Sequence, residues 1–294
     1  METNSRPRLR LALSGVVALA MLAASASAQV GADANISPKR VVFDGGDRAA
    51  TVFVFNQGGA PATYGVETVD RIMRSDGQIV ALADLSATDR AAAETEMRSA
   101  QAMVQFTPRR VTLQPGQSQA IRVRALRPGG LGEGEYRTHL TVTAVPPEDA
   151  GLTAEQALNP ASGELGVRVT ALFSLSIPVI VRSGRADVRA AVENARMVAG
   201  EAQTPPAVTV DLVRQGASSV YGDLEVRGQA QRGREGELFG RVRGIGVYPE
   251  ITRRPVRIPL SRAPASGERL SVVFRDDDTR PGEALATVAL PPSG

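Results

Sequence analysis

Short runs of β-branched residues recur from Ile36 to the C-terminus, and turn-forming residues separate them. The turns contain Gly, Asp and Pro, which either tolerate a positive φ or fix φ for a turn. The strands expected from these runs cover residues 40–43, 50–56, 62–72, 104–107, 110–113, 118–126, 134–145, 165–181, 209–214, 220–227, 238–247, 256–259, 269–274 and 284–290. Many short strands joined by such turns are typical of β-sandwiches. The sequence therefore predicts an all-β protein.

Two segments depart from this pattern. Residues 84–103 are rich in Ala, Glu, Arg and Met, and Ser86 or Thr88 can cap a helix there. We expect a short helix or an ordered loop at this place. Residues 146–163 are polar and contain prolines, which predicts a long loop.

The chain is long enough for two domains. About eight expected strands precede residues 182–189 and about six follow them, with one further candidate strand at 186–192. We therefore expect two β-sandwiches in series, an N-terminal domain at 29–183 and a C-terminal domain at 184–294.

The first 28 residues have the pattern of a secretory signal peptide. Three arginines lie before a short apolar run at 11–24, and the small residues 26–28 form a cleavage pattern. The run is shorter than the about 20 residues that a membrane-spanning helix needs. We expect residues 1–28 to be cleaved and the protein to be exported; an uncleaved N-terminal anchor is the alternative.

The composition excludes several kinds of chemistry. The chain has no Cys and no Trp, and its single histidine is His139, so disulfides, thiolate metal sites and multi-histidine metal sites are excluded. Neither a serine elbow nor a glycine-rich phosphate loop is present. We expect no catalytic activity, no metal, no cofactor and no small-molecule substrate. His139 is expected at the surface or between strands, and the aspartates at 276–278 in a solvated turn.

The net charge gives no reason to expect nucleic acid as a partner. It is +3 for the whole chain, and it falls to +1 without the first 28 residues, which hold three arginines and one glutamate. A nearly neutral chain has no electrostatic attraction for a polyanion.

Residues 165–181 are far longer than a typical strand of about 5–6 residues. The odd positions are apolar throughout: Leu165, Val167, Val169, Ala171, Phe173, Leu175, Ile177, Val179 and Val181. Alternate side chains share one face of a strand. Pro178 cannot donate a backbone hydrogen bond, so it belongs at a sheet edge or where the strand leaves the sheet. Two interpretations stay open: the row fills the core of its own sandwich, or an edge strand offers it to another polypeptide.

Four stretches resemble, in order and spacing, the periplasmic pilus-assembly chaperones of the PapD type. They are 36–45 (ISPKRVVFDG), 106–123 (FTPRRVTLQPGQSQAIRV), 134–147 (GEYRTHLTVTAVPP) and the long segment 165–182. The resemblance covers the first domain. The rest of the chain is only an all-β region of suitable length.

The resemblance implies two immunoglobulin-like sandwiches in an L-shaped arrangement and a location in the periplasm. It implies a chaperone that caps pilus or surface-organelle subunits by donor-strand complementation, a form of strand addition. The chaperone would then deliver these pilin-like subunits to an outer-membrane usher. The donor residues would be Leu165, Val167, Val169, Ala171, Phe173 and Leu175. When free, the exposed row could form a self-capping dimer.

The family binds the subunit's C-terminal carboxylate with an arginine on the first strand and a lysine near the end of the long strand. Arg40 matches the arginine, and a guanidinium can meet a carboxylate with two hydrogen bonds. Pro178 falls at or beside the position of the lysine. Either Arg40 alone holds the carboxylate, or Lys39 or Arg182 assists, or the client is not a conventional pilin.

Two other functions remain open. A structural or adhesive two-sandwich envelope protein would use residues 165–181 as ordinary core. A scaffold for envelope assembly that binds no client is a weaker alternative.

Overall fold

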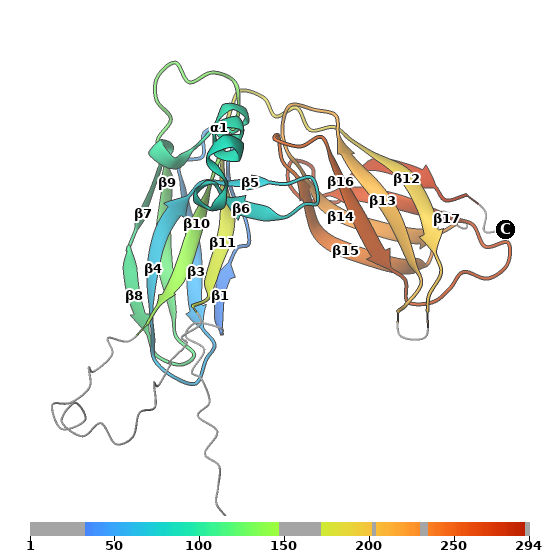
Figure 1. Ribbon diagram of the computed structural model, residues 1–294, viewed down its shortest axis with the longest axis horizontal. Coiled ribbons are helices and arrows are strands. Elements are labelled where there is room, and N and C mark those ends of the chain that lie inside the picture. Colours follow the sequence, from blue (N-terminus) through green and yellow to red (C-terminus); the bar gives the residue numbers. More distant parts are fainter. Residues whose placement is uncertain (1–32, 147–171, 202–203, 230–234, 292–294) are drawn as a thin grey trace, which may run out of the picture.

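The computed structural model describes residues 33–146, 172–201, 204–229 and 235–291. The expected signal peptide, most of the expected loop at 146–163 and the donor residues Leu165, Val167, Val169 and Ala171 lie outside the described residues. The described chain folds into two β-sandwiches that meet in an L (Figure 1).

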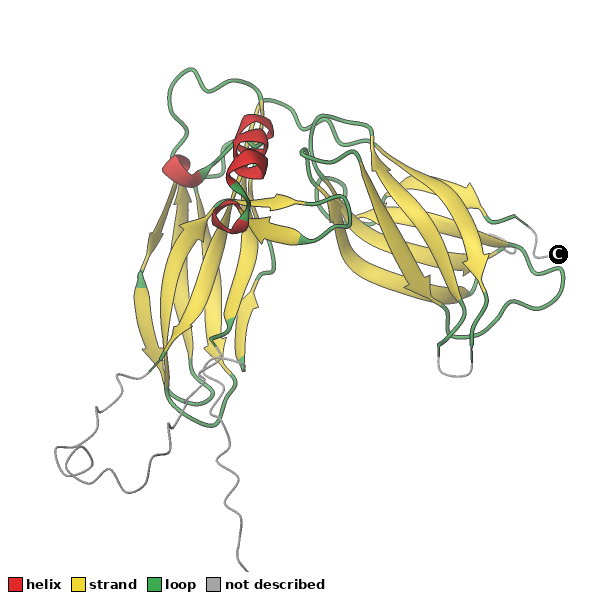
Figure 2. Ribbon diagram, viewed as in Figure 1, coloured by secondary structure: helices red, strands yellow, loops and turns green. Residues whose placement is uncertain are grey.

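The first domain packs two sheets face to face (Figure 2). One has the strand order β1-β3-β9-β7 and the other the order β2-β11-β10-β4-β8. The strands are β1 Ala34–Ser37, β2 Val41–Phe43, β3 Ala49–Asn56, β4 Ala62–Val69, β7 Val104–Thr107, β8 Arg110–Leu113, β9 Ser118–Ala125, β10 Gly134–Val145 and β11 Ser174–Ser183. The chain changes sheets between β1 and β2, and β2 runs parallel to β11. This order is that of an immunoglobulin-like sandwich, which confirms the expected fold class.

The core lies between the two sheets. On β3 and β9 the inward residues Val52, Val54, Ile121 and Val123 are fully buried and the residues between them are exposed or half-buried. Leu140 of β10 lies in the same core. Burial of each such side chain contributes roughly 1.5–3 kcal/mol, and the period-two pattern fixes the register because a one-residue slip would expose the whole row.

The connection between β4 and β7 holds a hairpin and the helices. Its elements are β5 Arg71–Met73, β6 Ile79–Ala81, η1 Leu82–Asp84, α1 Ala87–Glu96 and η2 Gln101–Met103. The side chain of Ser86 caps α1 by accepting a hydrogen bond from the backbone N–H of Asp89 at 3.2 Å, which confirms the expected helix. The expected strand at 62–72 divides at Asp70 instead, and β5 pairs with β6 in a hairpin that extends toward the second domain (Figure 1).

The second domain is also a sandwich, with a three-stranded sheet β12-β13-β16 and a four-stranded sheet β15-β14-β17-β18. The strands are β12 Ala190–Val198, β13 Ala207–Arg214, β14 Val220–Gly228, β15 Leu238–Val247, β16 Arg253–Pro259, β17 Leu270–Asp276 and β18 Ala284–Ala289. The candidate strand at 186–192 was misplaced. The backbone carbonyls of Asp187 and Arg189 accept hydrogen bonds from the loop after β13, so regular pairing begins only at Ala190.

The two domains meet through a small apolar cluster of Met73, Ile180 and Tyr248. Ile180 reaches it from the face of β11 that is turned away from the first core, and Met73 comes from the β5–β6 hairpin. The backbone N–H of Met73 also donates to Oε1 of Glu250 at 2.7 Å. In the part of the chain that the structure describes, no helix is long and apolar enough to cross a membrane.

Candidate functional site: an open strand edge beside an interdomain ion cluster

Strand β11 is paired along its whole length on one side and only in part on the other. Its ten residues lie opposite residues 134–143 of β10. On its other side, β2 pairs only with Val179–Val181. Among the described residues, 174–178 therefore have a strand neighbour on one side alone.

The backbone groups along this open edge have a defined direction. The amide of Ala144 donates to the carbonyl of Phe173 at 3.1 Å, so Phe173 forms a hydrogen-bonded pair with β10. Such pairs alternate with pairs that are not hydrogen-bonded, so the even residues of β11 direct their N–H and C=O groups away from β10. The N–H groups of Ser174 and Ser176 thus face the open edge. Pro178, which has no N–H, occupies the same side.

The apolar row of β11 leaves the core near Leu175. Ile177, Val179 and Val181 are buried in the first core, and Leu175 packs against it half-buried. Phe173, the next residue of the row, is 40% exposed. The core interpretation therefore holds for Ile177, Val179 and Val181, whereas Phe173 lies largely outside this core. Leu172 beside it is 51% exposed.

The face of β10 and β11 that is turned away from the core carries polar side chains. Thr141 and Ser176 lie opposite each other, and their hydroxyls are 2.9 Å apart. His139 lies opposite Pro178 and is only 2% exposed, so it is an inter-strand histidine. Burial lowers its pKa well below the usual 6.5, and the charges of Arg137 and Arg71 lower it further. The imidazole is therefore neutral near pH 7.

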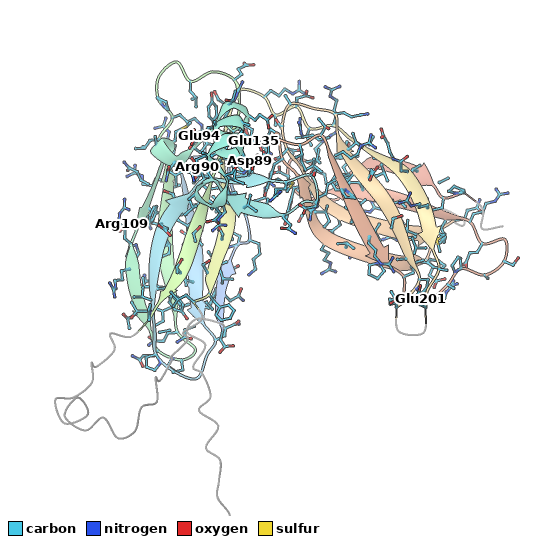
Figure 3. The ribbon with its side chains drawn as sticks, in the orientation of Figure 1. Asp89, Arg90, Glu94, Arg109, Glu135 and Glu201 are labelled. Carbon is cyan, nitrogen blue, oxygen red and sulfur yellow. The ribbon has the colours of Figure 1, made fainter. Side chains whose placement is uncertain are left out.

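An ion cluster links the domains at the corner of the L, where Figure 3 labels Glu135. Arg182, at the end of β11, donates from Nε to Glu135 Oε2 at 3.2 Å and from Nη2 to Asp278. All three side chains are at most 5% exposed. Burial lowers the pKa of Arg182, but hydrogen bonds and charges of Asp278 and Glu135 outweigh it and raise that pKa.

The expectation of a solvated turn at 276–278 was wrong. Asp276 is buried and accepts hydrogen bonds from the backbone N–H groups of Thr279 and Arg280. Asp278 lies between two arginines at the domain interface. Only Asp277 is exposed. A run of acidic residues resembles a solvated turn in the sequence because its arginine partners come from a distant part of the chain.

Arg40 lies at the same corner. Its Nη2 donates to Asp278 Oδ2 at 2.8 Å and to Ser219 Oγ at 3.2 Å, and its guanidinium carbon lies 4.6 Å from the ring centroid of Tyr221. The side chain is 8% exposed. Its Nε and Nη1 have no hydrogen-bond partner among the described residues, so two donors of a buried cation remain unused.

The two residues considered as helpers of Arg40 are placed differently. Arg182 uses all three guanidinium nitrogens on Glu135 and Asp278. Lys39 is exposed and donates to the side chain of Asn35 on β1. Of the three cations, only Arg40 has free donors at the corner.

A second ion pair holds the domains together near the apolar cluster. Arg137 of β10 binds Glu250 through both terminal nitrogens, with Nη1 3.1 Å from Oε2, and both side chains are at most 5% exposed. The guanidinium carbon of Arg137 lies 3.9 Å from the ring centroid of Tyr248. Bidentate, stacked arginines are geometrically specific, so this pair fixes how the second domain sits on β10.

The sequence did not identify Glu135, Ser219, Glu250 and Asp278 as parts of the site. Glu135 and Arg137 stand at alternate positions of β10, on the face that is turned away from the core, and this pair of charges is the only local signal. No group of three or more His, Cys, Asp or Glu that could hold a metal ion occurs within the described ranges.

Comparison with known proteins gives structural matches alone. No family model and no curated protein matches the sequence. The crystal structure of the class 5 fimbriae chaperone CfaA is 13% identical at a TM-score of 0.42, and the match covers 88% of this chain and all of that one. The Pseudomonas aeruginosa CupB2 chaperone is 14% identical at a TM-score of 0.41, with 88% and 100% covered.

A third match is the complex of the chaperone CsuC with the tip adhesion subunit CsuE from archaic chaperone-usher Csu pili of Acinetobacter baumannii. It is 11% identical at a TM-score of 0.41, with 89% of this chain and 99% of that chain covered. TM-scores below 0.5 carry no argument about function. The assignment of the fold therefore rests on the strand order and register of this chain.

Proposed function

We propose that the protein is a periplasmic chaperone that binds pilus or surface-organelle subunits by donating the edge of β11 to them. The observation that carries the proposal is the open edge at residues 174–178, where backbone donors and acceptors face outward beside an apolar row that leaves its own core. An open strand edge of this kind is a template for pairing with another chain.

A subunit that lacks one strand has a surface complementary to this edge. It exposes an apolar groove and a row of unpaired backbone groups. Ser174 and Ser176 supply backbone hydrogen bonds to such a partner, and Phe173 supplies an apolar side chain, in the manner of strand addition. The donor residues Leu165, Val167, Val169 and Ala171 continue the same alternation in the sequence. Burial of a Val or Phe side chain contributes roughly 1.5–3 kcal/mol, so the whole row gives tight binding.

Arg40 is the proposed anchor for the terminal carboxylate of the subunit. Its Nε and Nη1 have no hydrogen-bond partner among the described residues, although both atoms are buried. A bidentate contact with a carboxylate uses neighbouring donors, Nε with Nη2 or Nη1 with Nη2, so the subunit's carboxylate would have to displace Asp278 or Ser219 from Nη2. Tyr221 below the guanidinium and Ser219 beside it hold the side chain in place. No lysine assists, because Pro178 stands at or beside that position and Lys39, which lies between β1 and β2, donates to Asn35 instead.

The location and the further partner of the protein follow from the same proposal. A cleaved signal peptide at residues 1–28 would export the chain to the periplasm. The chaperone would there deliver its subunit to an outer-membrane usher. The resemblance of the first domain to PapD-type chaperones supports both steps.

The test is co-purification of the full chain from the periplasm of cells that also express its genomic neighbours, with the captured protein identified by mass. We expect a β-rich exported subunit at one-to-one stoichiometry. Phe173→Asp should weaken its binding about 10- to 150-fold, the equivalent of the roughly 1.5–3 kcal/mol that one buried apolar side chain contributes.

The matched control is Leu238→Asp in the second domain, because Leu238 is 39% exposed and Phe173 40%. This control should leave binding unchanged. If no subunit is captured and Phe173→Asp unfolds the protein, β11 is ordinary core. The protein is then a structural or adhesive two-sandwich protein, and the chaperone proposal fails.

A further inference from the structure

The outer face of the sheet β1-β3-β9-β7 has an unusual composition. The core covers the other face of this sheet, so alternate residues of its four strands point outward. They are Asn35, Ser37, Ala49, Thr51, Phe53, Phe55, Gln105, Thr107, Ser118, Ala120, Arg122 and Arg124, which we call the β3–β9 face. None of these residues is acidic, whereas two are arginines.

The arginines of this face have no acidic partner. Arg122 and Arg124 are both exposed. Among the described residues, no carboxylate oxygen lies within 4.0 Å of a guanidinium nitrogen of either arginine, so neither forms an ion pair. By contrast, Arg227, Arg241 and Arg275 on the sheet face of the second domain all bind Glu225. Glu225 thus partly neutralises the arginines on that face of the second domain, whereas Arg122 and Arg124 have no carboxylate beside them among the described residues.

The same face exposes an aromatic pair. Phe53 is 42% exposed, its ring centroid lies 6.3 Å from that of Phe55, and both rings belong to β3. Ala120 lies opposite Phe53 on β9 and leaves the ring uncovered. Asn35 lies opposite Phe55 on β1, and the ammonium of Lys39 donates to it. Lys39 therefore lies on the β1 side of the aromatic pair, and Arg122 lies two residues from Ala120 along β9, opposite Thr51.

We propose that the β3–β9 face docks a protein surface on which carboxylates surround an apolar side chain. The charges favour an anionic partner, since the face offers cations and no carboxylate. The alternating Ser, Thr, Asn and Gln side chains disfavour a bilayer, because a lipid surface would have to desolvate them around only two aromatic rings. Exposed aromatic and arginine side chains are also enriched at protein interfaces.

This interface goes beyond the proposed function and does not depend on it. The second domain contacts the other sheet of the first domain, through Ile180 and Arg182 of β11. The core of the first domain separates that sheet from the β3–β9 face. A partner can therefore occupy the β3–β9 face while a subunit strand occupies the edge of β11.

The test uses the full chain and fluorescence anisotropy with three labelled, end-blocked peptides. They are EELFEE, which has acidic residues around an apolar pair, EESGEE, which lacks the apolar pair, and KKLFKK, which has the opposite charge. We expect saturable binding of EELFEE alone, weakened at least tenfold when the salt concentration rises from about 50 mM to about 500 mM. Arg122→Glu with Arg124→Glu should abolish binding, and Phe53→Ser should weaken it at least fivefold.

The matched control is Arg74→Glu with Arg110→Glu, which makes the same change of charge at two exposed arginines outside the face. This control should retain peptide binding. Phe173→Asp should also retain it, and a loss of binding in Phe173→Asp would instead place the peptide at the edge of β11. Thermal melts show whether each variant folds. If Arg122→Glu with Arg124→Glu fails to fold, Arg122→Gln with Arg124→Gln replaces it. The proposal is overturned if EELFEE does not bind, or if Arg74→Glu with Arg110→Glu loses as much affinity for EELFEE as Arg122→Glu with Arg124→Glu does. It is also overturned if the protein binds phosphatidylglycerol vesicles and no peptide.

Discussion

Removal of the Asp278 carboxylate should destabilise the protein strongly, because two buried arginines depend on it. Arg40 and Arg182 both bind Asp278, with side chains that are 8% and 2% exposed. Breaking a buried ion pair by removing one partner costs about 3–5 kcal/mol. Arg182 keeps Glu135 as a partner, so we expect the lower end of this range for Asp278→Ala, about 3 kcal/mol.

The assay is urea denaturation of the purified chain, accompanied by a thermal melt. For a protein of this size, about 3 kcal/mol corresponds to a fall in Tm of roughly 6–12 °C. Asp277→Ala is the matched control, because Asp277 precedes Asp278 directly and is exposed. Surface substitutions of this kind change stability by about 0.5 kcal/mol or less.

A double-mutant cycle tests whether the lost stability comes from the interaction between Asp278 and Arg182. Arg182→Met should destabilise the protein on its own. If the two residues interact, the double variant should lose less stability than the two single losses together. The reasoning is refuted if Asp278→Ala is no more destabilising than Asp277→Ala, or if the losses of Asp278→Ala and Arg182→Met simply add.

Two further predictions concern single charged residues. Arg40→Ala should lower the affinity for the captured subunit at least tenfold in titration calorimetry. With this variant, removal of the subunit's terminal carboxylate should lower the affinity no further. If it still does, Arg40 is not the anchor. Burial raises the pKa of Glu225, but hydrogen bonds from Arg227 and Arg275 outweigh it and lower that pKa from 4.5 to about 2. Because the folded pKa is the lower one, the stabilisation is present above about pH 4.5 and is lost as the pH falls toward 2. Between pH 5 and pH 2 the wild type should therefore lose about 3 kcal/mol more than Glu225→Gln in urea denaturation, and parallel losses would contradict this.

The fold was predictable because its determinants are local. The alternation of β3 and β9 and the glycine and proline turns define strands without knowledge of their neighbours, and Ser86 marks the start of α1. The strand β1 was missed because it is only four residues long and carries the polar residues Asn35 and Ser37. The break at Asp70 was missed because the flanking residues continue the β pattern.

The site was only partly predictable because its determinants are not local. Arg40 was identified through resemblance, but its partner Asp278 lies 238 residues away in the chain. The alternation of residues 165–181 indicated an apolar row without indicating where the row leaves the core. It also could not indicate how much of the edge is open, because that depends on β2, which pairs with only three residues of β11. Pairing partners and charge compensation arise from tertiary contacts, which no local pattern contains.

The most direct test of the open edge is residue-resolved hydrogen exchange of the free protein and of its complex with a subunit. In the free protein the amides of Ser174 and Ser176 should exchange rapidly, while those of Leu175 and Ile177, which face β10, should be protected. Binding of a subunit should slow exchange at Ser174 and Ser176 by at least 100-fold. Protection of these two amides in the free protein, with no change on addition of the subunit, would contradict strand donation by β11.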